Sequence, residues 1–322
     1  MPGGKCDEAI YGVPVLKKSI TNVGASIRQR LLNLARQRNE DFALVLTKYG
    51  LERVLFRISQ SRHRHVFVLK GAFLFELWTE QRYRPTRDVD FLARGGKTPQ
   101  QFRTMFKEIC GVAVVEDGLR FDMTTVEAER IREDVDYHGV RVIFTGRLEN
   151  ARIPVQIDIG FGDVITPPPQ EAEFPTLLDL PAPRLLMYPK ETVVAEKFEA
   201  MTRLGIANTR MKDLYDIGSL CRAFSFKGSI LSEAILNTFN RRKTAVPAEK
   251  PLVFTAEFYQ DENKRRQWDG FCNKNQAYAA EMSLKTICSE LETFLMPVLE
   301  ALRKNERLQD TWRPAGPWSD SR

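Results

Sequence analysis

The stretch RPTRDVDFLARGGKT, residues 84–98, contains two short motifs in succession. Asp88 and Asp90 form an Asp-x-Asp pair, and a Gly-Gly-Lys-Thr run follows it. The run resembles the end of a phosphate-binding Walker A loop, but that loop requires a glycine at the position that Phe91 occupies. We therefore interpret the run as a glycine turn before a helix over residues 98–110 that begins at a threonine cap. The Asp pair is left as the candidate site.

Asp90 belongs to a predicted short strand, VDFL at 89–92, and Asp88 directly precedes it. Side chains two residues apart on a strand project from the same face, so Asp88 and Asp90 stand together while Val89 and Phe91 enter the core. Adjacent carboxylates repel unless a cation lies between them, and Mg²⁺ is bound in this way when it also contacts substrate phosphates. Solvated strand ends carry the same pattern, so the interpretation needs support from other segments.

A third carboxylate is expected near the pair. PVQIDIGFG, residues 154–162, has the alternation of a strand, and Asp158 lies on the face opposite Ile157 and Ile159. It points toward the Asp pair if the two strands are neighbours. Three carboxylates on adjacent strands can hold two metal ions that clamp the attacking and leaving oxygens of a phosphoryl displacement. An aspartate on an edge strand is the alternative. Further strands are predicted at 66–69, 112–115 and 140–148.

Two later helices direct charged residues inward. YPKETVVAEKFEAM, residues 188–201, places Lys190 and Lys197 on its apolar face and its glutamates on the other side. Lys190 also falls in the first turn, where backbone amides and the helix dipole favour phosphate. The next helix, in NTRMKDLYDIGSL, places Asp213 at the edge of its apolar side and Asp216 farther out. Lysines that snorkel beside a core are the alternative.

In this order, the motifs resemble the AbiEii/AbiGii toxin-type nucleotidyltransferases of the polymerase-beta-like superfamily. The resemblance runs through LERVLFRISQS, FVLKGAFLFELW, RPTRDVDFL, PVQIDIGFGD, YPKETVVAEKFEAM, NTRMKDLYDI and RRQWDGFCNKN. It implies an α+β (mixed α/β) bilobed enzyme, in which a mixed sheet carries the metal carboxylates and a mainly helical C-terminal domain closes over the nucleotide. We predict N-terminal helices packed on the core over 1–60, a nucleotidyltransferase core domain over 61–182, a helical domain over 183–312 and a disordered tail over 313–322.

The resemblance also implies roles for single residues. The expected catalytic residues are Asp88, Asp90, Asp158, Lys190 and Asp213, of which the three strand aspartates would bind Mg²⁺ or Mn²⁺. The expected nucleotide-binding residues are Lys70, Gly71, Thr86, Arg87, Lys197 and Arg210. The sequence departs from the family at Ala72, which stands where a glycine or serine usually follows the glycine of the phosphate turn. A hydroxyl contact to phosphate is therefore lost.

The function implied is a toxin that transfers NMP from an NTP to the 3′ end of tRNA and so blocks translation, with a protein antitoxin as partner. In a related toxin the antitoxin phosphorylates a hydroxyl residue two before the Asp pair, which corresponds to Thr86; a turn residue after Pro85 is the alternative. The basic runs at 240–243 and 264–268 are candidate RNA contacts, with Trp268 as a stacking platform. The alternative for Trp268, which is at helical spacing from Phe271, is a place in the core. The alternatives are transfer to a protein side chain or small molecule, a metal-dependent glycosyltransferase, and a catalytically inactive nucleotide- or RNA-binding module.

Composition limits these possibilities only broadly. The chain has 322 residues and a net charge of +6, which allows a polyanionic partner without requiring one. Its three histidines lie in no nucleophile or zinc motif, so carboxylates and lysines must carry any chemistry, and its five scattered cysteines are predicted to pack. No apolar run reaches the roughly 18 residues of a membrane span, and no apolar signal stretch opens the chain. A cytoplasmic protein without membrane contact is expected.

Overall fold

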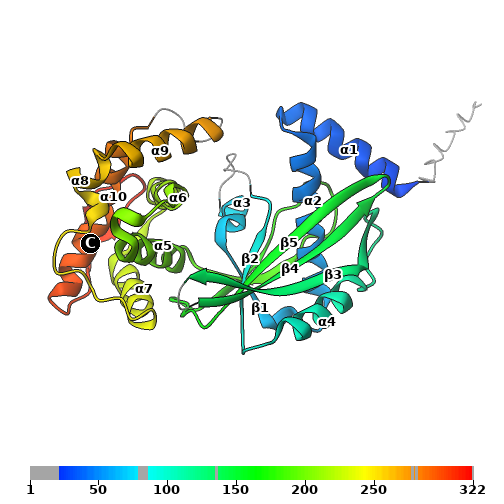
Figure 1. The fold of residues 1–322 in the computed structure, drawn as a ribbon, viewed down its shortest axis with the longest axis horizontal. Coiled ribbons are helices and arrows are strands. Elements are labelled where there is room, and N and C mark those ends of the chain that lie inside the picture. Colours follow the sequence, from blue (N-terminus) through cyan, green and yellow to red (C-terminus); the bar gives the residue numbers. More distant parts are fainter. Residues whose placement is uncertain (1–21, 79–85, 135–136, 277–278, 280–281, 321–322) are drawn as a thin grey trace, which may run out of the picture.

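Seven strands form a mixed sheet in the first lobe, in the order β3-β4-β5-β2-β1-β7-β6 (Figure 1). The computed structural model describes residues 22–78, 86–134, 137–276, 279 and 282–320. In chain order the strands are β1 (Phe67–Lys70), β2 (Val89–Ala93), β3 (Leu119–Asp134), β4 (Tyr137–Leu148), β5 (Ala151–Phe161), β6 (Gln170–Glu173) and β7 (Arg184–Met187). β2 is parallel to β5 and β1 is parallel to β7, whereas the other neighbours are antiparallel. The predicted α+β fold with a mixed sheet is confirmed.

The central strands are short and buried because helices and turns cover them. All four residues of β1 are buried, and Val89 and Phe91 of β2 have no exposed surface. The Phe67 ring lies 5.1 Å from the Phe91 ring and 5.6 Å from the Phe106 ring, measured between centroids. This aromatic packing holds β1 and β2 against the helix that follows them.

Helices α2 (Phe42–Gln60) and α4 (Pro99–Cys110) cover one face of the sheet. α2 packs against β5 and β7, α4 packs against β3 and β4, and the two helices contact each other. α4 begins where the sequence predicts, because Thr98 and Gln101 form a reciprocal capping box at its N-terminus. α1 (Val23–Arg38) packs on α2, as expected for the N-terminal helices, although residues 1–21 of that predicted unit lie outside the described residues.

One buried carboxyl on α2 ties the helix to the segment before β7. Glu52 is 2% exposed; its Oε2 accepts a hydrogen bond from the Leu177 amide at 2.6 Å, and its Oε1 lies 2.6 Å from Arg53 Nη2. Arg53 in turn donates to the Pro181 carbonyl oxygen at 3.0 Å. Burial, only partly offset by Arg53 and the Leu177 amide, raises the pKa of Glu52 from 4.5 to about 7.

This shift predicts a pH dependence of the stability. A carboxyl whose pKa is raised by folding contributes stability that is fully present below its unfolded pKa, near 4.5, and is lost as the pH rises through about 7. The Glu52→Gln variant should therefore gain up to about 3 kcal/mol on the wild type between pH 4.5 and 8. Urea unfolding of both proteins across this range measures the difference. Parallel curves would show that Glu52 titrates normally in the folded protein.

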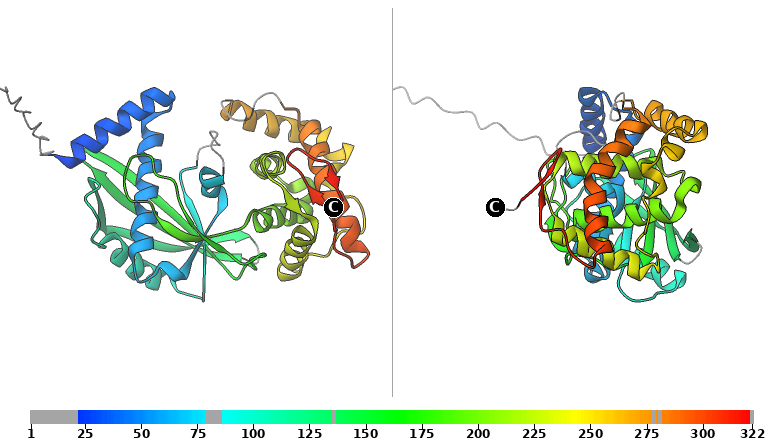
Figure 2. Two further views of the ribbon diagram at one scale, coloured as in Figure 1. Left: turned by 180° about the vertical axis from the view of Figure 1, so that it is seen from behind. Right: turned by 90° about the vertical axis from the view of Figure 1, so that its left-hand side faces the viewer.

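The second lobe is built of helices that follow β7 directly (Figure 2). They are α5 (Lys190–Leu204), α6 (Met211–Ala223), α7 (Gly228–Arg241), α8 (Ala256–Tyr259), α9 (Glu262–Lys274) and α10 (Leu284–Arg303). α5 contacts α6 and α7, and α10 packs across the same two helices. Because only two residues separate the end of β7 from the start of α5, this lobe is attached to the sheet through its first helix. Among the helices described, none combines the length and apolarity that a bilayer crossing requires.

The predicted disordered tail is wrong for residues 313–320. β8 (Phe226–Lys227), β9 (Thr311–Trp312) and β10 (Trp318–Ser319) form a small antiparallel sheet on the second lobe. The Trp312 and Trp318 rings lie 4.9 and 5.7 Å from the Phe294 ring of α10, measured between centroids. Trp312 Nε1 donates to the Cys221 carbonyl oxygen at 2.7 Å, and Trp318 Nε1 donates to that of Phe294 at 2.9 Å. Aromatic burial therefore orders a segment whose proline and glycine content predicts disorder.

Two further expectations are corrected by the sheet. β7 lies beside β1, so the sheet extends past the predicted boundary at residue 182 and ends at Met187. The predicted strand VAVV at 112–115 is a loop, in which Val115 is 65% exposed. The loop is held at its far end by Asp117, whose backbone carbonyl oxygen accepts from the Tyr49 hydroxyl and whose carboxylate accepts from Arg57. These contacts leave the valines no neighbouring strand to pair with.

Candidate functional site

Four neighbouring strands bring four charged residues into one row. Asp90 on β2 is the register partner of Lys70 on β1 and of Asp158 on β5, and Asp158 is the partner of Arg141 on β4. Residues directly opposite on paired strands share a face of the sheet. The row therefore reads cation, carboxylate, carboxylate, cation across the centre of the sheet. The predicted neighbourhood of Asp158 and the Asp pair is confirmed.

The Asp pair lies at the start of β2, as the strand pattern predicts. Asp88 and Asp90 are partly exposed, while Val89 between them is fully buried. The Thr86 hydroxyl donates to Asp88 Oδ1 at 2.6 Å, and Thr86 itself is 7% exposed. Thr86 is thus a direct partner of the first aspartate. Arg87 is exposed beside them.

Gly71 directly contacts the second aspartate. Its φ is +77°, in the region that favours glycine, and a Cβ built on it would lie 2.0 Å from Asp90 Oδ2. Gly71 opens the 3₁₀ turn Gly71–Leu74, which leads from β1 into α3 (Phe75–Trp78). The expected glycine turn therefore lies against the carboxylate of Asp90, next to the place where the phosphates are expected. Ala72 after it is buried.

Lys70 reaches toward the second lobe. Its Nζ lies 3.3 Å from Asp163 Oδ2 and 4.0 Å from Glu196 Oε2 of α5. Arg242 completes the group, because its Nη2 lies 3.2 Å from Asp163 Oδ1 and its Nη1 lies 2.9 Å from Glu199 Oε2. We call these five residues the interlobe cluster.

Burial explains the electrostatics of the interlobe cluster. It raises the pKa of Glu196, although Lys70 and Arg242 act in the opposite direction. Burial alone would lower the pKa of Arg242, but Glu196 and Asp163 outweigh it and the pKa is raised. The prediction that the α5 glutamates face away from the interior is wrong, because α6 and α7 both pack against this helix: Glu191 is 6% exposed and Glu199 has no exposed surface.

Lys190 is placed at the sheet edge but not in contact with the Asp pair. It is the first residue of α5, with Pro189 as the N-cap. The Tyr188 amide donates to the Leu69 carbonyl oxygen at 2.9 Å, so the start of α5 and the Gly71 turn leave the parallel strands at the same edge. Lys190 Nζ lies 3.1 Å from Glu191 Oε1 and 5.2 Å from the centre of the Phe226 ring.

Lys197, Arg210 and Asp213 come together within the second lobe. Lys197 Nζ lies 2.6 Å from Asp213 Oδ1 and 2.8 Å from Asp216 Oδ2, and Arg210 Nε lies 2.7 Å from Asp213 Oδ2. Both aspartates have no exposed surface, so the prediction that Asp216 points farther outward is wrong. Lys197 lies between them and compensates both charges. A direct contact between Asp213 and a nucleotide would require these pairs to open.

Three residues of the site, Arg141, Asp163 and Arg242, are not predicted from the sequence. Arg141 binds Asp158 with two hydrogen bonds, Nε to Oδ1 at 2.8 Å and Nη2 to Oδ2 at 2.7 Å. The sequence does indicate that Arg141 leaves the core face, because it is the charged residue between the buried Val140 and Val142 of β4. That it pairs with Asp158 follows only from the strand register. Asp163 gave no local signal. Arg242 was assigned to a basic run for RNA, whereas its contacts are with buried carboxylates.

The second predicted RNA segment is also corrected. Trp268 is 1% exposed, and its Nε1 donates to the Met282 carbonyl oxygen at 2.6 Å, so it is no stacking platform. Lys264 is 4% exposed and donates to the Asn208 carbonyl oxygen at 2.7 Å. Both side chains instead pack α9 onto the rest of the second lobe.

The residues fit a metal ion at the Asp pair but not at Asp158. Two carboxylates together with substrate phosphate oxygens are a common setting for Mg²⁺, and Asp88 and Asp90 supply them. Both oxygens of Asp158 accept from Arg141, and its Oδ2 also accepts from Gln156 Nε2 at 3.2 Å. Within the described residues, no group of three or more acidic, histidine or cysteine side chains is arranged to hold a metal ion.

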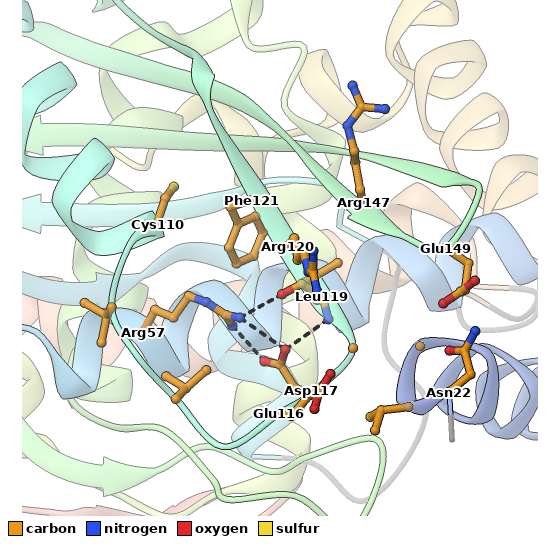
Figure 3. Close-up of a pocket in the computed structure, with 15 residues that line it drawn as sticks. Asn22, Arg57, Cys110, Glu116, Asp117, Leu119, Arg120, Phe121, Arg147 and Glu149 are labelled. Atoms are coloured by element: carbon orange, nitrogen blue, oxygen red, sulfur yellow. Dashed lines mark hydrogen bonds and ion pairs between the residues drawn. The ribbon is translucent and has the colours of Figure 1, made fainter. Parts of the chain in front are cut away.

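A separate pocket of about 730 Å³ lies elsewhere in the first lobe (Figure 3). It is bounded by the start of α1, the loop after α4 and the beginning of β3. Figure 3 shows the Arg57 guanidinium reaching the Asp117 carboxylate inside it, at 2.7 Å. None of the lining residues belongs to the charge row or the interlobe cluster. The pocket is therefore distinct from the candidate site.

Residues 53–289 match the model of the family described as the nucleotidyl transferase AbiEii toxin of type IV toxin–antitoxin systems. The chain belongs to the AbiEii family. This match spans β1, β2 and β5 and the helices α5 and α6, so all the candidate site residues of the AbiEii chain lie within it. The predicted family is confirmed, and with it the assignment to the nucleotidyltransferases.

Two solved structures are similar to this AbiEii chain at low levels. JHP933 from Helicobacter pylori has a TM-score of 0.46 at 15% identity, covering 80% of this chain and 92% of that one. A second H. pylori protein, described as a candidate nucleotidyltransferase, has a TM-score of 0.41 at 15% identity, covering 80% of this chain and 95% of that one. No curated protein matches the chain.

Proposed function

We propose that this AbiEii chain transfers NMP from an NTP to the 3′ end of tRNA, with release of pyrophosphate, and that it thereby inhibits translation as a toxin. The observation that carries the proposal is the Asp pair at the start of β2, in register with Lys70 and Asp158 and in contact with the Gly71 turn. Such an edge combines carboxylates, cations and a glycine turn, which are the groups that a triphosphate and a metal ion require.

The reaction forms one bond and breaks one. The 3′-hydroxyl oxygen of the RNA attacks the α-phosphorus, the bond from that phosphorus to pyrophosphate breaks, and the hydroxyl proton passes to solvent. Mg²⁺ or Mn²⁺ held by Asp88 and Asp90 would polarise the α-phosphate and ease deprotonation of the attacking hydroxyl. The Gly71 turn brings backbone amides close to the phosphates, and Lys190 in the first turn of α5 neutralises the triphosphate.

The remaining predicted residues act around this centre. Lys70 holds the phosphates from the strand next to Asp90, and exposed Arg87 approaches them from solvent. Lys197, Asp213 and Arg210 fix α6 against α5 and so hold the wall of the second lobe that faces the nucleotide. Phosphorylation of Thr86 by an antitoxin would replace its hydrogen bond to Asp88 with about two negative charges beside the Asp pair.

An RNA acceptor is supported by the surface of α1. This helix carries four arginines and no acidic residue, and Arg28, Arg30 and Arg36 are exposed. Figure 1 shows α1 of the first lobe and α9 of the second lobe on opposite sides of α3. A long polyanion that reaches beyond α3 on the side of the first lobe would therefore meet α1. Arginines that neutralise phosphates bind nucleic acid without regard to sequence.

The test is the destination of the label from an α-labelled NTP. The purified protein is incubated with total tRNA, Mg²⁺ and each labelled NTP in turn, and RNA is then separated from protein. We expect label in RNA with the wild type and none with Asp88→Asn, a nearly isosteric variant that removes one metal-binding charge.

The distribution of label decides between the alternatives. Label in protein would move the acceptor to a side chain, and label in neither fraction would contradict transfer to tRNA. Equal labelling of RNA by Asp88→Asn would show that the Asp pair is not the centre of the reaction. Thermal unfolding of both proteins confirms that the variant is folded.

A further inference from the structure

We propose that Asp158 acts as the positioning residue for Arg141 and not as a metal ligand, and that Arg141 is a catalytic residue that binds the reacting α-phosphate. The proposal rests on the function proposed above and deepens it. It reassigns the third carboxylate of the row and adds a cation to the site.

The hydrogen bonds of Asp158 leave it poorly suited to bind a metal ion. An ionised carboxylate has about four lone-pair directions, and three are taken here by Arg141 Nε, Arg141 Nη2 and Gln156 Nε2, at 2.8, 2.7 and 3.2 Å. The guanidinium does not lose its charge at any ordinary pH, so it cannot vacate the carboxylate by titration. A metal ion would have to displace a two-point, charge-assisted pair at a residue that is 8% exposed.

The geometry of this pair instead makes Arg141 a fixed donor. Its Nε and Nη2 edge is bound to Asp158, so the two hydrogens on Nη1 point away from that carboxylate. Within the described part of the chain no residue accepts a hydrogen bond from Nη1, and the side chain is 35% exposed. The guanidinium therefore offers solvent-facing donors in an orientation that Asp158 holds.

The direction in which these donors lie is set by the charge row. β5 separates Arg141 from β2, and Asp158 is in register with Arg141 on one side and Asp90 on the other. Asp158 raises the pKa of Arg141 most, and the charge of Asp88 also contributes, which places the guanidinium within electrostatic reach of the Asp pair. A phosphate held beside Asp88 and Asp90 therefore lies near the free edge of Arg141.

The free Nη1 edge of Arg141 can stabilise the transition state of the transfer. Charge spreads over the non-bridging oxygens of the α-phosphate as the leaving pyrophosphate departs, and a preorganised planar cation stabilises it without rearrangement. A lysine at position 141 would keep one charge, but it could not bind Asp158 at two points and keep donors for the phosphate. Fixing Arg141 is thus the contribution of Asp158.

Mn²⁺ binding separates this assignment from metal ligation. Wild type, Asp158→Asn, Arg141→Lys and Asp88→Asn are titrated with Mn²⁺ in the presence of an NTP analogue that cannot be cleaved between the α- and β-phosphates. We expect Asp158→Asn and Arg141→Lys to bind Mn²⁺ within about twofold of the wild-type affinity, and Asp88→Asn to lose at least about tenfold. Loss of Mn²⁺ affinity in Asp158→Asn equal to that in Asp88→Asn would overturn the proposal.

The rate of transfer supplies the second readout. Asp158→Asn and Arg141→Lys should each lower kcat about 100-fold with little change in the KM for NTP, as for removal of one transition-state donor. The double variant should be no slower than the worse single one, because both changes remove the same interaction. Full activity of Arg141→Lys would overturn the catalytic role.

Failure of the proposed function gives a different result. If the wild type transfers no label to RNA, the proposed function is wrong, and the Mn²⁺ titrations still decide whether Asp158 or Asp88 binds the metal ion. Thermal unfolding of each variant controls for folding. Arg141→Lys retains the charge opposite Asp158, so it serves as the second variant if Asp158→Asn fails to fold.

Discussion

Gly71→Ala should lower the rate of nucleotidyl transfer by about 100-fold or more while the protein remains folded. The new Cβ would lie 2.0 Å from Asp90 Oδ2 and 2.8 Å from its Cγ, so the carboxylate has to move by roughly an ångström or more. A displacement of about 1 Å in a catalytic group typically costs two orders of magnitude in rate. The measurement is kcat/KM for the labelled NTP.

Gly95→Ala is the matched control for this prediction. Gly95 has a φ of +76°, nearly that of Gly71, but a Cβ built on it meets nothing within 4 Å. Both variants therefore carry the backbone strain of an alanine at positive φ, about 1–2 kcal/mol, and only one carries the collision with Asp90. Gly95→Ala should keep activity within about twofold of the wild type. Equal activity of the two variants would show that Asp90 tolerates the displacement.

Arg242→Met should destabilise the protein by about 3–5 kcal/mol, the largest stability effect that we expect of any single substitution in the interlobe cluster. The substitution keeps much of the side-chain volume but removes the cation that faces Asp163, Glu196 and Glu199. The side chains of these three carboxylates are 4%, 17% and 0% exposed. Unpaired charges in such a setting cost far more than the pair contributes. Urea unfolding at pH 7 measures the loss.

Arg241→Met is the control for Arg242. Arg241 precedes it in the chain, is exposed, and donates to the Gly162 carbonyl oxygen, so its loss leaves no buried charge unpaired. We expect its effect to stay below about 1 kcal/mol. The deficit of Arg242→Met should also shrink as the pH falls, because protonation removes the unpaired charges of the carboxylates. A deficit that is equal for both arginines, or independent of pH, would contradict the role of the cluster.

Local pattern predicted the parts of the site that depend on one strand or helix. The alternation of VDFL places Val89 and Phe91 inside and the Asp pair outside, because strand geometry alone determines it. Thr98 caps α4 for an equally local reason. The partners of Asp158 and Lys70 could not be predicted in this way. Arg141 reaches Asp158, and Asp163 and Glu196 reach Lys70, only after strands and lobes have assembled.

The errors have the same origin. The glutamates of α5 are expected in solvent because a helix with one apolar face is the usual case. In the structure, Glu196 and Glu199 are instead neutralised by Lys70 of β1 and by Arg242 after α7. The tail is expected to be disordered because Trp312 and Trp318, the two residues that order it, do not belong to a helical or strand pattern of apolar residues. Their burial depends on Phe294, far away in the sequence.

The position of the indole rings makes the chain its own optical probe. Of its four tryptophans, Trp268, Trp312 and Trp318 lie in the second lobe, each with its ring nitrogen bound to a backbone carbonyl oxygen, and Trp78 lies in the first lobe at the end of α3. Emission is therefore dominated by the helical lobe, whereas circular dichroism of β structure reports mainly the other. Whether the two signals change together during unfolding reveals if the lobes melt as one unit, and Arg242→Met is the substitution that should separate them.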